Sequence, residues 1–151
     1  MITKELEATK KCCLYASDFH LEMILVPYIK KRFDKTKFVI LTENNLEDTI
    51  KTLLNRINID KSDKDKILDL KWYSNDNEKL DKIKELNEKN NKICIIINGN
   101  YNYIKEKNKK LNELMKDNLE IIDCFNISDS ETNIEEIQYK YKEFINTSTL
   151  N

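Results

Sequence analysis

Five short apolar runs recur along the chain, and a polar stretch follows each of them. They cover residues 11–15, 37–42, 68–73, 92–97 and 119–127. The run at 92–97 (KICIII) is the most apolar, and the run at 37–42 (KFVILT) is rich in β-branched and aromatic residues. Uninterrupted runs of this kind indicate strands that are buried on both faces, as in a parallel sheet. The sequence therefore predicts five strands, of which 68–73 (LDLKWY) has the weakest pattern.

The segments between these runs carry apolar residues three or four positions apart, which is the spacing of a helix with one buried face. The clearest stripe follows the first strand, at Leu21, Ile24, Leu25, Tyr28 and Ile29. Asp18 precedes this stripe and can cap a helix, and Pro27 should kink the helix or mark its first turn. Thr132 and Glu135 have the spacing of a capping box for the last helix. The pattern thus places a helix after every predicted strand.

Alternation of strands and helices is typical of βαβ units. The predicted fold is α/β: a three-layer α/β/α sandwich with a mostly parallel, five-stranded sheet of Rossmann- or RecA-like type. Residues 1–151 are predicted to form a single domain, because this length suits one hydrophobic core. Residues 1–10 are predicted to be an N-terminal helix or arm, and residues 147–151 a frayed tail.

The charged residues narrow the classes of function. The 26 Lys and Arg residues nearly balance the 27 Asp and Glu residues, and both signs are interspersed. Because no basic stripe stands out, no nucleic-acid partner is predicted. No apolar stretch approaches the ~20 residues of a membrane span, and the N-terminus lacks the apolar core of a signal peptide. No membrane partner is predicted, and the expected location is the cytoplasm.

The sequence also argues against a metal or cofactor. All four cysteines fall in predicted strands: Cys12, Cys13, Cys94 and Cys124. In a cytoplasmic chain they are expected to be free, buried thiols, and a single histidine leaves too few ligands for a metal site. Both glycine-rich phosphate motifs are missing, so no nucleotide cofactor is predicted. The only glycine, Gly99, follows a strand, where it should adopt a positive φ or allow a close approach.

The candidate binding site follows from the predicted topology. In parallel α/β sheets, ligands bind outside the carboxyl ends of the strands. The candidate residues there are Tyr15, Ser17, Asp18, His20, Thr42, Glu43, Asn44, Trp72, Asn98 and Asn100. This set is rich in amides, aromatic rings and carboxylates and poor in Lys and Arg. It therefore suits a polar, uncharged or cationic small ligand better than a polyphosphate.

Three of these residues have chemistry that an enzyme could use, and each has a structural alternative. His20 with Asp18 or Glu22 could act as a general base, because a carboxylate orients an imidazole, or it could simply contact a helix start. Glu43 could be a base or a metal ligand, or it could serve the positive end of the following helix. Trp72 could stack on a planar ligand, or it could belong to the rim of the core.

Several segments resemble the MEDS domain, the sensory domain of DcmR-like regulators. They are CCLYASDFHLEMILVPYIKKRF, KFVILTENNLEDTIKTLL, LDLKWY and KNKKLNELMKDNLEIIDCFNIS. The positions that match are Tyr15, Pro27, Glu43, Leu68, Trp72, Leu111, Asn112, Cys124 and Phe125. The resemblance covers residues 11–128, and it implies a KaiC/RecA-type core that has lost its phosphate loop and serves in regulation.

The chain departs from the family at three places. Lys11 and Cys12 replace the histidine that the family has near its first strand. Residues 98–100 (NGN) stand where the family has an acidic residue, and Asn126 replaces an Asp. No attached kinase or DNA-binding domain is expected, so signalling is expected to pass through a separate partner.

The leading prediction is a non-enzymatic regulatory or sensory domain that binds a small ligand or a partner protein at the carboxyl ends of the strands. One alternative is a small α/β enzyme, of flavodoxin-like or related architecture, that uses His20 and Glu43 as acid and base. The other is a pure interaction module, in which apolar helix faces extend into an oligomer interface. A protein partner or a homodimer is therefore expected beside the possible ligand.

Overall fold

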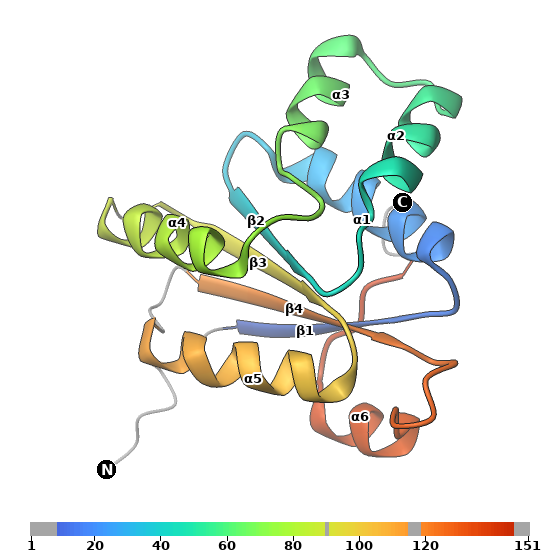
Figure 1. Cartoon of the computed structure of the whole chain (residues 1–151), viewed down its shortest axis with the longest axis vertical. Helices are drawn as coiled ribbons and strands as arrows, with labels where there is room; N and C mark the ends of the chain where they lie inside the picture. The colour runs from blue at the N-terminus through green and yellow to red at the C-terminus, as the bar shows by residue number, and fades with distance from the viewer. Residues whose placement is uncertain (1–8, 90, 115–118, 147–151) are drawn as a thin grey trace.

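The structure is a computed structural model, and it describes residues 9–89, 91–114 and 119–146. Its strands are β1 (Thr9–Tyr15), β2 (Lys37–Thr42), β3 (Ile93–Asn98) and β4 (Leu119–Asn126). Its helices are α1 (Asp18–Arg32), α2 (Glu47–Arg56), α3 (Lys61–Leu68), α4 (Asp76–Glu88), α5 (Tyr101–Leu111), the 3₁₀ helix η2 (Asn112–Leu114) and α6 (Ile134–Lys140). Figure 1 shows these helices arranged around one central sheet. Within the described ranges, no helix is both long enough and apolar enough to cross a bilayer.

The sheet has four strands in the order β1-β4-β3-β2, and every neighbouring pair is parallel. The predicted α/β class with a parallel sheet is confirmed. The predicted five-stranded sheet is wrong, because residues 68–73 do not form a strand. They contain the end of α3 and a turn in which Lys71 has a positive φ of 61°. The predicted last strand, 119–127, ends one residue earlier, at Asn126.

Trp72 explains part of this error. Its side chain is fully buried among residues of α1, α2 and α3, and its indole N–H donates to the Ile67 carbonyl oxygen at 2.7 Å. The apolar residues of LDLKWY therefore anchor a turn onto the helices. A run of two leucines and one tryptophan separated by charged residues satisfies either role, so pattern alone did not distinguish them.

Lys79 of α4 occupies the place where a further strand would pair with β2. Its Nζ donates to the carbonyl oxygens of Ile40 (2.7 Å), Leu70 (3.1 Å) and Lys71 (2.6 Å). Because residues 37 and 43 bond to β3, the carbonyl of Ile40 points to the opposite, free edge of β2. Three acceptors match the three N–H bonds of an ammonium group, although burial lowers the pKa of Lys79 to about 8. One side chain thus ties the turn to the edge strand.

The other edge of the sheet carries a short backbone bridge. Cys12 in β1 accepts a backbone hydrogen bond from Ile145 at 2.9 Å and donates one to Glu143 at 3.0 Å. The bridge between Cys12 and Phe144 is parallel, but it is too short to form a named strand. β1 therefore lies between β4 and residues 143–145.

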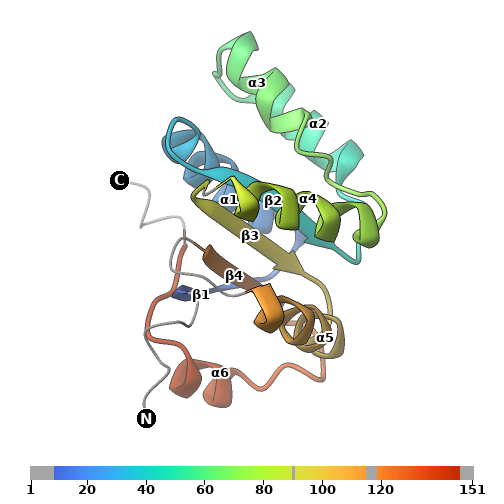
Figure 2. The same cartoon turned by 90° about the vertical axis from the view of Figure 1, so that its left-hand side faces the viewer.

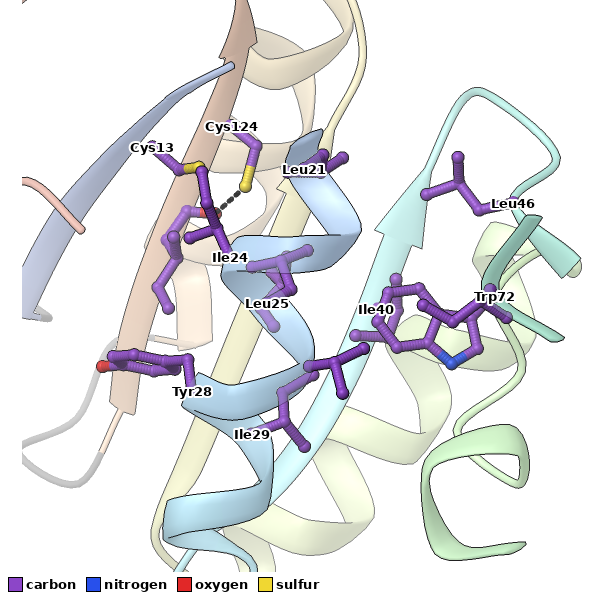
Figure 3. Close-up of a cluster of buried hydrophobic side chains, with 14 of the residues drawn as sticks. Cys13, Leu21, Ile24, Leu25, Tyr28, Ile29, Ile40, Leu46, Trp72 and Cys124 are labelled. Atoms are coloured by element: carbon purple, nitrogen blue, oxygen red, sulfur yellow. Dashed lines mark hydrogen bonds between the residues drawn. The ribbon is translucent and has the colours of Figure 1, made fainter. Parts of the chain in front are cut away.

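Side chains alternate between the two faces of each strand, and two apolar clusters result. On the α1 face, residues of α1 and α2 pack with Trp72 against Cys13, Ile40, Ile96 and Cys124 (Figure 3). On the α5 face, residues of α4, α5 and α6 pack against the opposite side of the same strands. All four cysteines are buried and free, as predicted.

The ends of the elements differ from the prediction in detail. Ser17, and not Asp18, is the N-cap of α1, and Asn133, and not Thr132, is the N-cap of α6. Pro27 lies inside a continuous α1 and so does not mark its first turn. The predicted helix or arm at 1–10 and the tail at 147–151 lie outside the described residues, except that residues 9 and 10 belong to β1.

Candidate functional site

The loop between β1 and α1 is held by its own side chains. The Ser17 hydroxyl oxygen accepts from the backbone N–H of His20 at 3.2 Å, and Nδ1 of His20 accepts from the backbone N–H of Ala16 at 2.9 Å. Among the described residues, neither Asp18 nor Glu22 bonds to the imidazole. The expected carboxylate–histidine pair is therefore not formed, and the ring supports the turn instead.

A chain of buried hydrogen bonds links the ends of three strands. The Tyr15 hydroxyl donates to Oδ1 of Asn98 at 2.5 Å, and Nδ2 of Asn98 donates to the Thr42 hydroxyl at 3.2 Å. The Thr42 hydroxyl in turn donates to the carbonyl oxygen of Asn44 at 2.8 Å. Burial raises the pKa of Tyr15 well above its usual range, so the phenol remains a donor. The sequence pattern correctly gathers these residues, but they satisfy one another.

Glu43 and Asn100 join the end of β2 to the start of α5. The Glu43 carboxylate accepts from the backbone N–H of Asn100 at 2.9 Å and from its side-chain amide at 3.4 Å. Gly99 has no positive φ, so the other predicted reason for glycine applies. A Cβ at Gly99 would lie 2.5 Å from the Tyr103 ring and 3.1 Å from the Glu43 Cβ. The loop is packed tightly around a residue without a side chain.

Glu22 is an unexpected buried carboxyl group on the α1 face. Its side chain is fully buried; the Thr49 hydroxyl donates to Oε2, and Oε1 has no partner among the described residues. Burial raises the pKa of Glu22 to about 7, with a smaller contribution from Asp18, while the bond from Thr49 acts in the opposite direction.

The ten predicted site residues thus divide into two groups. Ser17, Asp18, His20, Glu43, Asn44 and Asn100 are exposed or partly exposed, whereas Tyr15, Thr42, Asn98 and Trp72 are buried. Trp72 is a core side chain in this structure, with its N–H already bonded. We call the other nine residues the carboxyl-edge network. The hydrogen bonds described above hold its loops in place.

A second region, which the sequence did not point to, contains a cavity of about 1040 Å³. It lies on the α5 face, where α5 and α6 flank β4 and β1 (Figure 2). Pockets for small molecules typically measure ~300–1,000 Å³, so its size suits such a ligand. We call it the α5–α6 cavity.

Asp123 of β4 lies among the lining residues and is fully buried. Nδ2 of Asn108 donates to its Oδ1 at 2.9 Å, and the Tyr141 hydroxyl donates to its Oδ2. Nδ2 of Asn108 also donates to the Ile104 carbonyl oxygen at 2.9 Å, while Oδ1 of Asn108 has no partner among the described residues. Burial raises the pKa of Asp123, although both hydrogen bonds favour the charged form. A costly carboxyl group therefore sits beneath the cavity.

Aromatic and aliphatic side chains form much of the remaining lining. The Phe125 ring lies 6.4 Å from the Tyr101 ring and 6.1 Å from the Tyr141 ring, measured between centroids. Ile104 of α5 and Ile137 of α6 also line the cavity. These surfaces can pack against an apolar or aromatic ligand.

Charged residues surround the opening. The lining includes Lys10, Lys105, Lys109, Lys140 and Lys142, together with Glu131, Glu136 and Glu143. All eight are exposed to solvent. The outer part of the cavity is therefore well hydrated, in contrast to the buried carboxyl group.

Sequence reasoning missed the cavity residues for an identifiable reason. Asp123 interrupts the apolar run LEIIDCFNI, and a carboxylate in the middle of a buried strand was the available signal. Asn108 lies within a polar helix segment, and Tyr141 fits the apolar stripe of the last helix. The cavity exists because α6 packs at a distance from α5, and no local sequence pattern predicts that position of α6.

Within the described ranges, no group of three or more His, Cys, Asp or Glu residues is arranged to hold a metal ion. No protein-family model matches the chain, and neither a curated protein nor a solved structure does.

Proposed function

We propose that this chain is a non-enzymatic regulatory domain that binds a small ligand in the α5–α6 cavity. The observation that carries the proposal is the buried carboxyl group of Asp123 beneath a cavity with aromatic walls. Burying a carboxyl group costs free energy, and an apolar residue would suit a strand of this kind better. Converging polar groups in an otherwise apolar pocket are typical of binding sites.

The carboxyl-edge network offers a route by which binding could be transmitted. Tyr101, which lines the cavity, begins α5, and Asn100 is the N-cap of that helix. Glu43 at the end of β2 accepts both hydrogen bonds from Asn100. A ligand that displaces α5 would therefore move the loops at the carboxyl ends of the strands. In this proposal those loops, which carry the exposed predicted residues, are the surface read by a partner or second subunit.

The strand order differs from that of the flavodoxin-like architecture expected for the enzyme alternative. Rossmann sheets have the order 3-2-1-4-5-6 and flavodoxin-like sheets 2-1-3-4-5, whereas here β1 neighbours β4 and not β2. For the sheet we therefore propose the RecA-like architecture that the MEDS resemblance implies. A three-layer arrangement, with α1 on one face and α4, α5 and α6 on the other, belongs to the same proposal.

The contacts of the two acid/base candidates favour a structural role. Nδ1 of His20 bonds to the backbone of its own loop, and the Glu43 carboxylate bonds to Asn100. Each group therefore has a partner that fixes a turn. For this reason we prefer the ligand-binding function to the enzyme alternative.

Native mass spectrometry tests the proposal. The protein purified from its own host is compared, under native and denaturing conditions, with two variants. Glu136 lines the cavity and Glu135 does not, although both are exposed on α6, so Glu136→Trp blocks the cavity and Glu135→Trp is the matched control. We expect a small mass on the wild type and on Glu135→Trp that Glu136→Trp lacks. A ligand-free monomer or dimer in all three samples would contradict the proposal.

A pure interaction module remains the second candidate because of three exposed apolar residues. Phe19 (55% exposed) and Met23 (38%) lie one turn apart on α1, and Ile127 (43%) follows β4. If they form an interface between copies, the melting temperature should rise with protein concentration. Phe19→Glu should then abolish that dependence, and size-exclusion chromatography should show only monomers.

A further inference from the structure

We propose that the ligand of the α5–α6 cavity is a planar aromatic molecule that presents N–H donors, as an amidine, amine or amide, to Asp123 and Asn108. This inference rests on the proposed function and names the class of ligand. It is carried by the hydrogen-bonding pattern of three side chains and by the shape of the walls around them.

The orientation of the Asn108 amide is fixed by its neighbours. Nδ2 donates to two oxygen atoms, those of the Ile104 carbonyl and the Asp123 carboxyl group, each at 2.9 Å. Turning the amide over would place Oδ1 against both oxygens. Oδ1 is therefore an acceptor, and it has no donor among the described residues. A buried acceptor without a donor is costly, and a ligand N–H would remove that cost.

The Asp123 carboxyl group is the second acceptor. The Tyr141 hydroxyl donates to its Oδ2, and Tyr141 is the partly exposed C-cap residue of the short helix α6. In this proposal the ligand N–H takes the lone pair of Oδ2 that the Tyr141 hydroxyl occupies in the free protein. Tyr141 is thus a donor with which the ligand competes, and its ring covers the carboxyl group until the ligand binds.

The walls favour a flat ring. The Phe125 ring lies between those of Tyr101 and Tyr141, with the Tyr101 ring tilted by 31° and the Tyr141 ring by 67°. Aromatic faces and edges of this kind pack against a planar group through offset or edge-to-face contacts. If the N–H group is charged, the rings add a favourable interaction with the cation.

The lysines at the opening do not reverse the preference of Asp123 for a ligand with N–H donors over an anionic one. They are exposed and interspersed with three glutamates, so water screens them. Asp123 is fully buried, where an electrostatic interaction is several times stronger than in water. A ligand with an anionic group at its inner end would be repelled by this carboxyl group.

Three compounds of nearly the same shape test the inference: benzamidine, benzamide and benzoate. Calorimetric titration of each into the wild type should give the tightest binding for benzamidine and the weakest for benzoate. Asp123→Asn keeps the shape and removes the charge, and it should weaken benzamidine binding roughly ten- to a hundredfold. The melting temperature of each variant, measured alone, establishes that it is folded.

The variant Tyr141→Phe distinguishes two roles of the Tyr141 hydroxyl, competition with the ligand and a purely structural hydrogen bond. Removing the competing hydroxyl should lower the melting temperature of the free protein and yet tighten benzamidine binding. A residue that served only the fold would give the first effect without the second. Glu136→Trp should abolish binding of all three compounds, and Glu135→Trp should not.

The inference fails if benzoate binds as well as benzamidine, if none of the three compounds binds, or if either Asp123→Asn or Tyr141→Phe leaves benzamidine affinity unchanged. It also fails if Glu136→Trp still binds benzamidine. The proposed function fails separately, when the protein from its own host carries no small molecule that Glu136→Trp excludes. A cavity ligand that is anionic or not aromatic would therefore overturn the inference and leave the proposed function standing.

Discussion

Buried polar groups lie on the strands both in the carboxyl-edge network and beside the α5–α6 cavity, but the two regions differ in how far those groups are hydrogen-bonded. In the network, hydrogen bonds connect Tyr15 to Asn98 and Asn98 to Thr42, and each of these donors has an acceptor. Beside the cavity, Asp123 and Asn108 present more acceptor capacity than the described residues fill. The polar groups of the network satisfy one another, whereas those beside the cavity leave acceptor capacity that the proposed ligand would fill.

This difference shows why polar residues at strand ends are an incomplete guide to a binding site. A topological rule finds groups that lie together, and here it correctly grouped Tyr15, Asn98 and Thr42. It does not tell whether those groups are satisfied by one another. Burial and unfilled hydrogen-bonding capacity, which only the structure supplies, distinguish the two cases.

The largest expected effect comes from breaking the closed network. Asn98→Leu removes the acceptor of the Tyr15 hydroxyl and the donor to Thr42, and it leaves a buried phenol unpaired. We expect the free energy of unfolding to fall by about 3 kcal/mol, measured by urea denaturation. Asn102→Leu on the exposed face of α5 is the control and should change it by less than ~0.5 kcal/mol. If both variants lowered the free energy of unfolding equally, the hydrogen bonds of Asn98 would not stabilise the fold.

Gly99→Ala tests how tightly the same region is packed. The added methyl group would meet the Tyr103 ring, which is held at its far end by a hydrogen bond to Asp76. Overpacking of this kind costs about 1–3 kcal/mol. In a Tyr103→Ala background the penalty should largely disappear, which a double-mutant cycle measures. If the penalty persists in that background, its cause is the backbone and not the Tyr103 ring.

Glu22 allows a test by pH. Its pKa is raised from 4.5 to about 7 in the folded protein, so the folded state holds a proton that the unfolded state releases. The free energy of unfolding should therefore decrease as the pH rises from about 4.5 to about 7, by an amount on the order of 1 kcal/mol. Glu22→Gln should show a smaller decrease over the same interval. Identical pH profiles for the two proteins would rule out this carboxyl group as the source.

The smallest effect is expected in the cavity. Lys109→Trp places a large ring at the cavity, where there is room for it, and should change the free energy of unfolding by less than ~0.5 kcal/mol. Lys110→Trp, on the adjacent exposed position outside the cavity, is the matched control. Thermal melts of both variants should overlap with the wild type. A destabilisation like that of Gly99→Ala would show that the cavity is not open to a side chain.

Much of the fold was readable from apolar periodicity. The runs KFVILT and KICIII became neighbouring parallel strands, and the stripe from Leu21 to Ile29 is the buried face of α1. The run LDLKWY was misleading, because the alternation of its two leucines and its tryptophan with charged residues fits a strand, whereas the Trp72 side chain anchors a turn. A short apolar run does not indicate whether its backbone will pair with a strand or will be bound by a side chain, as Lys79 binds the turn here.

The candidate site was less readable, because it depends on residues distant in the sequence. Tyr15 and Asn98 are 83 residues apart, and they were grouped correctly because the ends of parallel strands meet. Asp123 comes from β4, Asn108 from α5 and Tyr141 from the C-cap of α6, and no local pattern encodes how these elements are placed relative to one another. Contacts of this kind depend on how α6 packs after β4, which is a property of the whole core.

The hydrogen bond from Lys79 to Ile40 bears on whether the sheets of two copies could join edge to edge. The outer edge of a sheet is a template on which a strand of another chain can add. At β2, a buried ammonium group already holds the central outward-facing carbonyl, and an incoming strand would have to displace it and two further hydrogen bonds. At β1, residues 143–145 occupy the opposite edge. Cross-chain pairing is thus opposed at the middle of each edge strand, by a single lysine at β2 and by the chain's own backbone at β1.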